Sequence, residues 1–372
     1  MREEKALVQA DGERAGYYPP AGEDWARCSP AEAGFDPDGL AAAVAFAVAH
    51  ESPIPYDLEH WISSGGAIVG APDRVLVGPT KARGPANGVV LRGGRLVAAW
   101  GDPRQVDMTF SVTKSYLATV AGLALDRGLI RDVHDRVRDY VDDGGFDSPQ
   151  NAPITWHHLL QQTSEWAGVL WDKPHEVDRP GSVDRRLGPP GTFFEYNDVR
   201  VNRLALALLR VWRRPLPEVF RELVAEPIGC SDTWQWHGYR NSWVEIDGVP
   251  MQSVSGGGHW GGGLWIHALD QARFGLLFQR RGRWQGRQLI SERWLDLMTT
   301  PCPLEPTYGY LWWLNTNRTF SPGAPATGFA AMGAGGNMIW IDPAHDLTIV
   351  ARWLDRDRRD ELLGLVYCAL GA

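Results

Sequence analysis

The chain has 372 residues, of which 44% are hydrophobic and 22% are charged, and it carries a formal net charge of −8 at pH 7. This length allows a large core in one or two domains, and this composition is typical of a soluble globular protein. The acidic balance argues against nucleic acid as a partner, because that partner would need a basic face. The sequence contains neither an apolar N-terminal leader nor a long apolar run, so we expect a cytoplasmic protein with no membrane partner.

The first hundred residues predict a helix and a hairpin. The sequence Ser29-Pro30-Ala31-Glu32 is typical of a helix start, and Leu40–Ala49 is typical of an Ala-rich helix. Residues 88–101 alternate apolar and polar side chains around Arg92-Gly93-Gly94-Arg95. This alternation, with two glycines at its centre, predicts a β-hairpin.

From Phe110 onward the apolar spacing becomes helical, and the pattern ends at Gly128. One apolar face is formed by Leu117, Val120, Ala121, Ala124 and Leu125. Up to about residue 250, short helical patterns then alternate with loops rich in Pro and Gly. These helical patterns cover residues 154–163, 200–213 and 216–229.

The C-terminal third predicts strands again. After the glycine-dense segment Gly256–Gly263, residues 268–281 predict a helix, 337–343 and 346–353 predict strands, and Arg359–Leu370 predicts a final helix. Strand patterns therefore lie towards both ends of the chain, with helical patterns between them.

This order of elements predicts the domain organisation. Residues 1–30 are polar and rich in Gly, Pro and Glu, which favours an N-terminal extension. We expect one main domain over 31–372, with an α/β part formed by residues 31–110 and 255–372 and a helical part over 111–254 inserted between them.

The strongest chemical motif is Phe110-Ser111-Val112-Thr113-Lys114, at the start of the helix that follows Phe110. Positions i and i+3 share a helix face, so we expect the Ser111 hydroxyl and the Lys114 amine within hydrogen-bond reach. A serine hydroxyl needs an adjacent base to act as a nucleophile, whereas an ordinary Lys, with a pKa of about 10.4, is protonated. Burial and the positive end of the helix dipole both disfavour the charged amine. The N–H of Ser111 is also a candidate oxyanion donor.

The choice of basic residues supports this interpretation. Of the 37 basic residues only Lys5, Lys81, Lys114 and Lys173 are Lys, and the others are Arg, which keeps its proton at working pH. The Ser-x-x-Lys spacing also arises by chance, so the motif alone is only moderately specific. A lysine on an otherwise apolar helix, in a chain that elsewhere uses Arg, favours a residue that must lose a proton.

Five segments, in this order, resemble the serine β-lactamase and DD-peptidase superfamily, in particular class C-like enzymes, family VIII carboxylesterases and 6-aminohexanoate-dimer hydrolases. The segments are residues 108–141 around the Ser-x-x-Lys motif, 154–168, 189–202 (PPGTFFEYNDVRVN), 260–275 (WGGGLWIHALDQARFG) and 329–350. The likeness extends from about residue 35 to the C-terminus, which makes it more specific than any single motif. It implies an α+β fold in which an antiparallel sheet is flanked by helices and a helical region is inserted.

The resemblance assigns Tyr196 to the second catalytic position, where a phenol relays the serine proton to the leaving group. The family motif is Tyr-x-Asn, whereas here Asp198 stands in the place of Asn. A carboxylate at this position would make a different hydrogen bond, would hold Lys114 or an arginine, or would indicate a substrate other than a β-lactam.

The third family motif, Lys-Thr-Gly or His-Thr-Gly, corresponds to Ala331-Met332-Gly333, which offers no cation for a substrate carboxylate. Gly333 still lets the backbone pass close to a substrate, and the N–H of Ala334 is the expected second oxyanion donor. The resemblance therefore implies a neutral ester or amide substrate rather than a penicillin-like one.

Other patterns carry weaker signals. The segment Gly256–Gly263 lacks the Gly-Lys-Ser/Thr of a phosphate loop, so we interpret it as a tight backbone passage near the cleft. His157 and His158 are adjacent, so on a helix their side chains point about 100° apart. His259 and His267 have no Cys, Asp or His partners at ligand spacing, so we predict no metal and no cofactor. There is no Gly-x-Ser-x-Gly motif and no sign of a Ser-His-Asp triad.

Several side chains are candidates for the substrate pocket. Eighteen residues are Trp, and Trp166, Trp171 and Trp260 lie in loops near the motifs, where they would line an aromatic pocket with Asp198 and Gly333.

Three functions remain open from the sequence. We favour a serine hydrolase that cleaves a small-molecule ester or amide through an acyl-enzyme, with Ser111, Lys114 and Tyr196 as its catalytic residues. The alternatives are a true β-lactamase or DD-peptidase, and a non-catalytic sensor or binding protein on the same fold.

Overall fold

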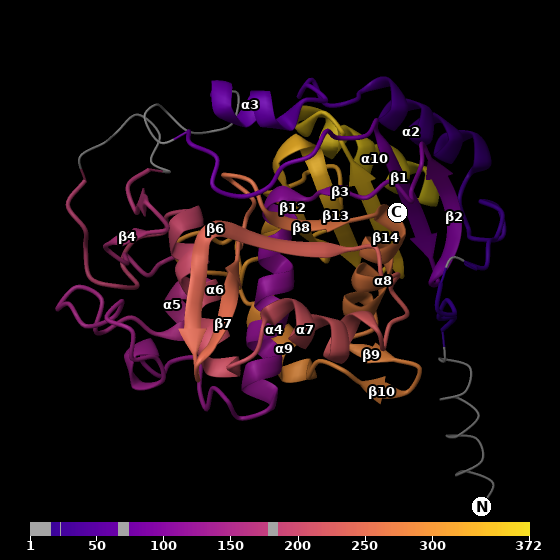
Figure 1. Ribbon diagram of the computed structural model, residues 1–372. Helices are drawn as coiled ribbons and strands as arrows, with labels where there is room; N and C mark the ends of the chain where they lie inside the picture. The colour runs from indigo at the N-terminus through magenta and orange to yellow at the C-terminus, as the bar shows by residue number, and fades with distance from the viewer. Residues whose placement is uncertain (1–15, 23, 66–73, 178–184) are drawn as a thin grey trace, which may run out of the picture.

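The computed structural model describes residues 16–22, 24–65, 74–177 and 185–372. Its six-stranded sheet is antiparallel and brings N-terminal strands next to C-terminal ones (Figure 1). The strand order is β11-β12-β13-β14-β1-β2, and β14 (Leu347–Arg352) pairs with β1 (Asn87–Arg92) so that Val350 lies opposite Val89. The other strands of this sheet are β2 (Arg95–Trp100), β11 (Trp313–Leu314), β12 (Phe329–Gly333) and β13 (Asn337–Asp342).

The hairpin predicted over residues 88–101 is confirmed as β1 and β2. Its turn places Gly93 and Gly94 at φ values of 60° and 78°. Two consecutive residues with positive φ match the right-handed twist of the strands, and glycine adopts this conformation without a Cβ clash.

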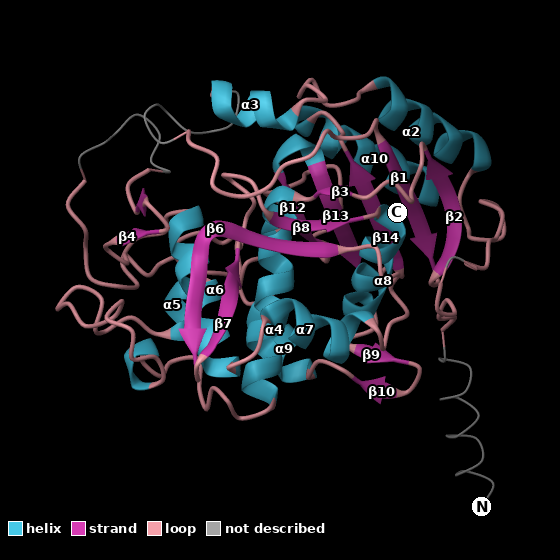
Figure 2. Ribbon diagram, in the orientation of Figure 1, coloured by secondary structure: helices cyan, strands magenta, loops and turns pink. Residues whose placement is uncertain are grey.

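Helices cover both faces of the sheet (Figure 2). Helices α2 (Pro37–Ala49) and α10 (Arg359–Leu370) pack on one face, against a core that includes Val90 and Ile349. Helix α8 (Ala268–Gln279) packs on the other face, against a core that includes Val89 and Val350. The side chains of neighbouring strand residues thus point into the cores on opposite faces of the sheet, as the alternation along a strand requires.

The helix start expected at Ser29 is wrong. Residues 30–34 form a single turn, held by the hydrogen bonds of Ser29 with Glu32 and ended by Gly34, whose φ is 83°. The helix begins at Pro37 instead, because the Asp36 side chain accepts a hydrogen bond from the Gly39 N–H and Pro occupies the first helical position.

The helix predicted from Phe110 is a short 3-10 turn, η1 (Phe110–Val112), followed by α4 (Thr113–Asp126). We expected one apolar face, but every residue of α4 from Thr113 to Leu125 is buried. Small and apolar side chains allow neighbours to approach on all sides, and a Cβ on Gly122 would lie 2.5 Å from the Trp294 ring. The helix that carries Lys114 is therefore a central helix of the molecule rather than a surface one.

The interval predicted to be helical contains α5 (Trp156–Leu160), α6 (Asp198–Trp212) and α7 (Leu216–Phe220), which continues into the π-helical turn η4 (Arg221–Ala225). It also ends in a long hairpin that the prediction missed, formed by β6 (Gln235–Ile246) and β7 (Val249–Val254). A register shift between Gly238 and Trp243 interrupts the alternation of its strands. The Asp247-Gly248 turn was the signal that identifies it, since both residues have positive φ.

The hairpin joins a second, four-stranded sheet in the order β3-β8-β6-β7, with β3 (Asp107–Met108) and β8 (Gly263–Ile266). The remaining elements are α3 (Leu58–Ser64), η2 (Val137–Asp139), β4 (Val169–Leu170), β5 (Lys173–Pro174), β9 (Arg283–Trp284), β10 (Arg287–Gln288), α9 (Glu292–Met298), η5 (Thr316–Arg318), η6 (Ala334–Gly336) and η7 (Arg356–Arg358).

The N-terminal extension predicted over residues 1–30 lies outside the described residues up to position 15. Its described part packs on the protein, because Trp25 is 8% exposed and donates its indole N–H to the Gly94 carbonyl at 2.7 Å. Within the described residues, no helix combines the length and the apolar character that a membrane span needs.

Candidate active site

Ser111 lies in the η1 turn, between strand β3 and helix α4, and its side chain is half-buried. The residue before it, Phe110, has a φ of 50°, a conformation that bulky residues adopt only when their surroundings hold them. Here two T-shaped ring contacts hold Phe110, with Trp61 at 5.9 Å and Trp353 at 6.2 Å between centroids. The packing of Phe110 thereby fixes the direction in which Ser111 leaves the turn.

Lys114 meets three polar side chains at one point. Its Nζ is 2.8 Å from Ser111 Oγ, 2.8 Å from Asp198 Oδ1 and 4.7 Å from the centroid of the Tyr196 ring. The Ser111–Lys114 contact is the one that the i, i+3 spacing predicted. Lys114 is 1% exposed, so its amine is removed from solvent except through these neighbours.

Asp198 is the first residue of α6, and the side chain of the preceding Asn197 caps that helix by accepting from the Arg200 N–H. A carboxylate at a helix N-terminus interacts favourably with the helix dipole. Burial raises the pKa of Asp198, but the charge of Lys114 and the hydrogen bond from His259 lower it by more, so its pKa lies well below the ordinary value. The carboxylate therefore stays ionised, and it places a negative charge 2.8 Å from the Lys114 amine.

His259 approaches the other oxygen of the same carboxylate, with 3.4 Å between Nδ1 and Asp198 Oδ2. In the sequence, this histidine has no partner at ligand spacing. The partner comes from α6, far away in the chain, and only folding brings the two together. Within the described residues, no group of three or more His, Cys, Asp or Glu side chains is arranged to hold a metal ion.

The glycine-dense segment covers this charged pair, as the interpretation of a tight backbone passage near the cleft expected. A Cβ on Gly257 would lie 1.7 Å from Asp198 Oδ1 and 2.5 Å from Lys114 Nζ. The backbone of the segment is therefore pressed against both charged side chains, and only glycine leaves room for them.

Strand β12 ends beside Ser111. A Cβ on Gly333 would lie 2.1 Å from the Thr109 carbonyl oxygen and 3.1 Å from the Ser111 nitrogen. Ser111 lies in the first turn of η1 and Ala334 begins η6, positions where a helix provides no acceptor for its own N–H groups. The two N–H groups assigned to an oxyanion site thus belong to adjacent backbone segments.

Tyr196 belongs to an aromatic cluster at the edge of the site. Its ring stacks on Trp313 at 5.6 Å and contacts Tyr308 edge-on at 6.0 Å. Trp313 in turn stacks on Phe320 at 5.3 Å. Tyr196 and Trp313 are both half-buried, so this cluster offers an aromatic surface next to Lys114. No motif in the sequence points to Trp313.

Two of the three tryptophans proposed for the pocket are buried inside the fold. Trp166 is 3% exposed and donates to the Gly145 carbonyl, and Trp260 is fully buried beside His259 and below Lys173. They therefore have almost no surface for a ligand. Trp171 is half-buried with a φ of 54°, and its contact with a ligand remains a prediction.

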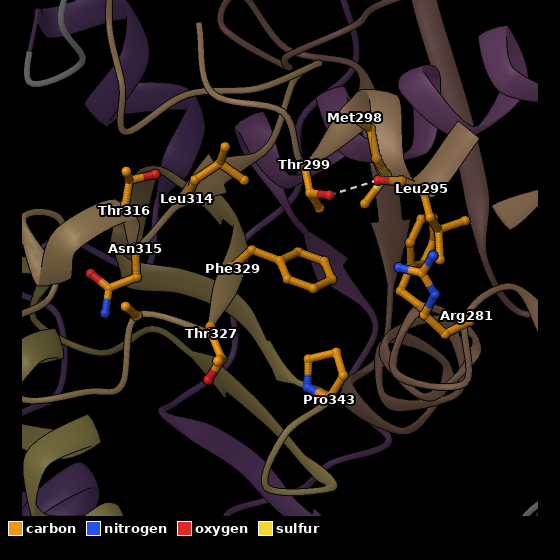
Figure 3. Close-up of a pocket in the computed structure, with 13 residues that line it drawn as sticks. Arg281, Leu295, Met298, Thr299, Leu314, Asn315, Thr316, Thr327, Phe329 and Pro343 are labelled. Atoms are coloured by element: carbon orange, nitrogen blue, oxygen red, sulfur yellow. Dashed lines mark hydrogen bonds between the residues drawn. The ribbon is translucent and has the colours of Figure 1, made fainter. Parts of the chain in front are cut away.

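A pocket of about 230 Å³ lies away from these residues, between α8, α9 and the ends of β11 and β12 (Figure 3). Leu314 and Phe329 line it, whereas the neighbouring Trp313 stacks on Tyr196. Adjacent strand residues point to opposite sides, so β11 separates this pocket from Ser111.

Comparisons with known proteins place the chain in a family and match its fold. A model of the Beta-lactamase family matches residues 73–357. No curated protein matches the chain significantly. Many solved structures share its fold, and three are described below.

A family VIII carboxylesterase is 19% identical, with 76% of this chain and 92% of that chain covered and a TM-score of 0.56. A β-lactamase from Mycobacterium bovis is 20% identical, covering 77% and 95% with a TM-score of 0.54. A protein from Bacillus anthracis assigned as a 6-aminohexanoate-dimer hydrolase is 16% identical, covering 84% and 92% with a TM-score of 0.54.

These likenesses confirm the expected α+β fold with its antiparallel sheet. The family model spans more than half of the chain, and it includes Ser111, Lys114, Tyr196 and Gly333. The chain therefore belongs to the beta-lactamase family, whose members are generally hydrolases.

Proposed function

We propose that the protein is a serine hydrolase that cleaves an ester or amide bond through an acyl-enzyme on Ser111. The observation that carries the proposal is the 2.8 Å contact between Ser111 Oγ and Lys114 Nζ, next to Tyr196. A nucleophile, an adjacent base and a third group that orients the base are the parts that covalent catalysis needs.

The proposed reaction begins with the amine form of Lys114. An ammonium on Lys114 must therefore lose a proton before its nitrogen can accept one from the Ser111 hydroxyl, 2.8 Å away. Ser111 Oγ then attacks the carbonyl carbon while its proton passes to Lys114 or Tyr196. The N–H groups of Ser111 and Ala334 stabilise the oxyanion. The leaving group departs with the proton, and water releases the acyl group by the same steps.

The substrate we propose is uncharged near the scissile bond. The β12 segment Ala331-Met332-Gly333 carries no cation to hold a substrate carboxylate. The aromatic cluster of Tyr196 and Trp313 provides apolar contact instead. The names of the carboxylesterase and the 6-aminohexanoate-dimer hydrolase among the similar structures support ester and amide chemistry.

The test uses p-nitrophenyl esters, linear amides and nitrocefin on the wild type and on Ser111→Ala. We expect ester or amide turnover, labelling of Ser111 by a fluorophosphonate, and a fall in kcat of about 10⁴-fold or more in the variant. Nitrocefin turnover that matches ester turnover would instead indicate a true β-lactamase or DD-peptidase, the alternative favoured by the family match. Stable labelling without repeated turnover would indicate a sensor, and full activity of Ser111→Ala would refute the proposal.

A further inference from the structure

The buried chain of contacts behind Ser111 extends beyond the Ser-Lys-Tyr set. Lys114 Nζ bonds to one oxygen of Asp198 at 2.8 Å, and His259 Nδ1 lies 3.4 Å from the other oxygen. The side chains of Lys114, Asp198 and His259 are 1%, 7% and 6% exposed. Each oxygen of the carboxylate thus has its own partner, and solvent is nearly excluded from all three residues.

We propose that Asp198, held by His259, is the counter-ion of Lys114. Because of this pair, the activity of the enzyme rises at a higher pH than it would with asparagine at position 198. This inference rests on the proposed function. Asp198 and His259 act through Lys114 and are positioning residues.

The charge of Asp198 is what distinguishes it from the asparagine found in related motifs. Both side chains can accept a hydrogen bond from Lys114, but only the carboxylate compensates the ammonium charge. A buried charge without a partner is strongly unfavourable, so the charge states of the two residues depend on each other. The carboxylate stabilises the ammonium, and more alkaline conditions are needed to produce the amine.

His259 has the opposite effect on this balance. When Lys114 loses its proton, Asp198 is left as a buried carboxylate, and the hydrogen bond from His259 then stabilises that lone charge. A neutral His259 thereby makes loss of the Lys114 proton easier than it would be beside an unassisted carboxylate. A protonated His259 would also compete with Lys114 for Asp198.

The packing prevents other groups from replacing these partners. The Gly257 backbone is pressed against both Lys114 and Asp198, as shown above. The other described titratable groups that face Lys114 are Tyr196 and Tyr308. Burial and the nearby Tyr196 raise the pKa of Tyr308 well above its ordinary value, so Tyr308 carries no charge here.

The test is the pH dependence of kcat/KM for a p-nitrophenyl ester and of the fluorophosphonate labelling rate. The acidic limb is the part of the pH profile in which activity rises with pH. In Asp198→Asn we expect this limb to shift to lower pH by about one unit or more, because an opposite charge within about 6 Å shifts a titration by about 1–3 units. At a pH one unit below the wild-type midpoint, the variant should then keep about half of its own maximum, against about a tenth for the wild type.

His259 supplies the matched comparison. His259→Phe removes the hydrogen bond and should move the same limb upward. His259→Asn places an amide N–H near the position of Nδ1 and should return the limb towards that of the wild type. A role in structure alone would lower activity in both Asp198→Asn and His259→Phe without moving their limbs in opposite directions.

The outcomes separate this inference from the proposed function. If the wild type is labelled at Ser111 and Ser111→Ala is inactive, but the Asp198→Asn limb stays in place or moves up, the counter-ion role is wrong. If Asp198→Asn fails to fold, as judged by circular dichroism, the His259→Phe and His259→Asn pair decides, and unmoved limbs in both would overturn the inference. Failure of labelling in the wild type would instead refute the proposed function.

Discussion

Two of the buried ion pairs that helix α6 makes differ in their cation. At its start, Asp198 pairs with Lys114, and the two side chains are 7% and 1% exposed. One and a half turns later, Arg203 pairs with Asp143, and both of these side chains are 4% exposed. Arg210 adds a second contact to Asp143 at 2.8 Å.

The two pairs have similar burial but different chemistry. A guanidinium does not lose its proton at working pH, so the Arg203–Asp143 pair is permanently charged and serves the framework. An ammonium can lose its proton, so the charge of the Lys114–Asp198 pair can change during a reaction. The difference teaches that burial and pairing alone do not identify a reactive group, and that the identity of the cation does.

The largest expected effect comes from making the two pairs alike. In Lys114→Arg the guanidinium still pairs with Asp198 but cannot accept the Ser111 proton, and we expect kcat/KM to fall by about 1,000-fold. The measurement is ester hydrolysis at matched protein concentrations. Arg203→Lys is the control, because it keeps the charge at the other pair and should leave kcat/KM unchanged. Activity of Lys114→Arg within tenfold of the wild type would contradict the role of Lys114 as a base.

A smaller effect is expected from breaking the permanent pair. Asp143→Asn leaves Arg203 buried without a counter-charge, and we expect the free energy of unfolding to fall by about 3 kcal/mol. Burial raises the pKa of Asp143, but Arg203 and Arg210 lower it below its ordinary value. The folded pKa is thus depressed, and the stabilisation is present above the unfolded value of about 3.9 and is lost as the pH falls through the folded value.

Urea unfolding of Asp143→Asn and the wild type at several pH values checks this prediction. The difference between the two proteins should be full at neutral pH and should shrink below about pH 4. A difference that does not depend on pH would show that the loss is one of packing rather than of charge.

The smallest effect is expected from substituting the glycines that pack on the two ion pairs. A Cβ on Gly257 would meet Asp198 at 1.7 Å, and a Cβ on Gly145 would meet the Arg203 guanidinium at 2.5 Å. Gly257→Ala should displace Lys114 and Asp198 and lower kcat/KM by about tenfold, because small displacements of catalytic groups are costly. Gly145→Ala should change stability without changing kcat/KM. Equal effects of both substitutions on activity would remove the distinction between the two regions.

Some features followed from short stretches of sequence. The contact between Ser111 and Lys114 follows from helical spacing, and the β1–β2 turn follows from Gly93-Gly94. In each case the residues involved are at most a few positions apart. Local backbone geometry therefore sets their distance whatever the rest of the chain does. The family resemblance also predicted roles for Tyr196 and Gly333, which are distant from Ser111 in the chain, because an ordered set of motifs carries information about a fold.

Other features depended on contacts between distant segments. From the sequence, the role of Asp198 stayed open between a different hydrogen bond, the holding of Lys114 or an arginine, and a substrate other than a β-lactam. No partner for His259 was visible at ligand spacing. The sequence also predicted a one-sided helix for α4, which proved to be buried on all sides, and it missed the β6–β7 hairpin.

By itself, the sequence determined the pairing of Ser111 with a lysine and the absence of a cation at Ala331-Met332-Gly333. Only the tertiary structure decided that Asp198 is the partner of Lys114, 84 residues away in the chain, and that His259 holds its second oxygen. The physical reason is that hydrogen bonds and the interaction of buried charges act over a few ångströms of space. The sequence lists the charges, but only the folded chain sets the distances between them.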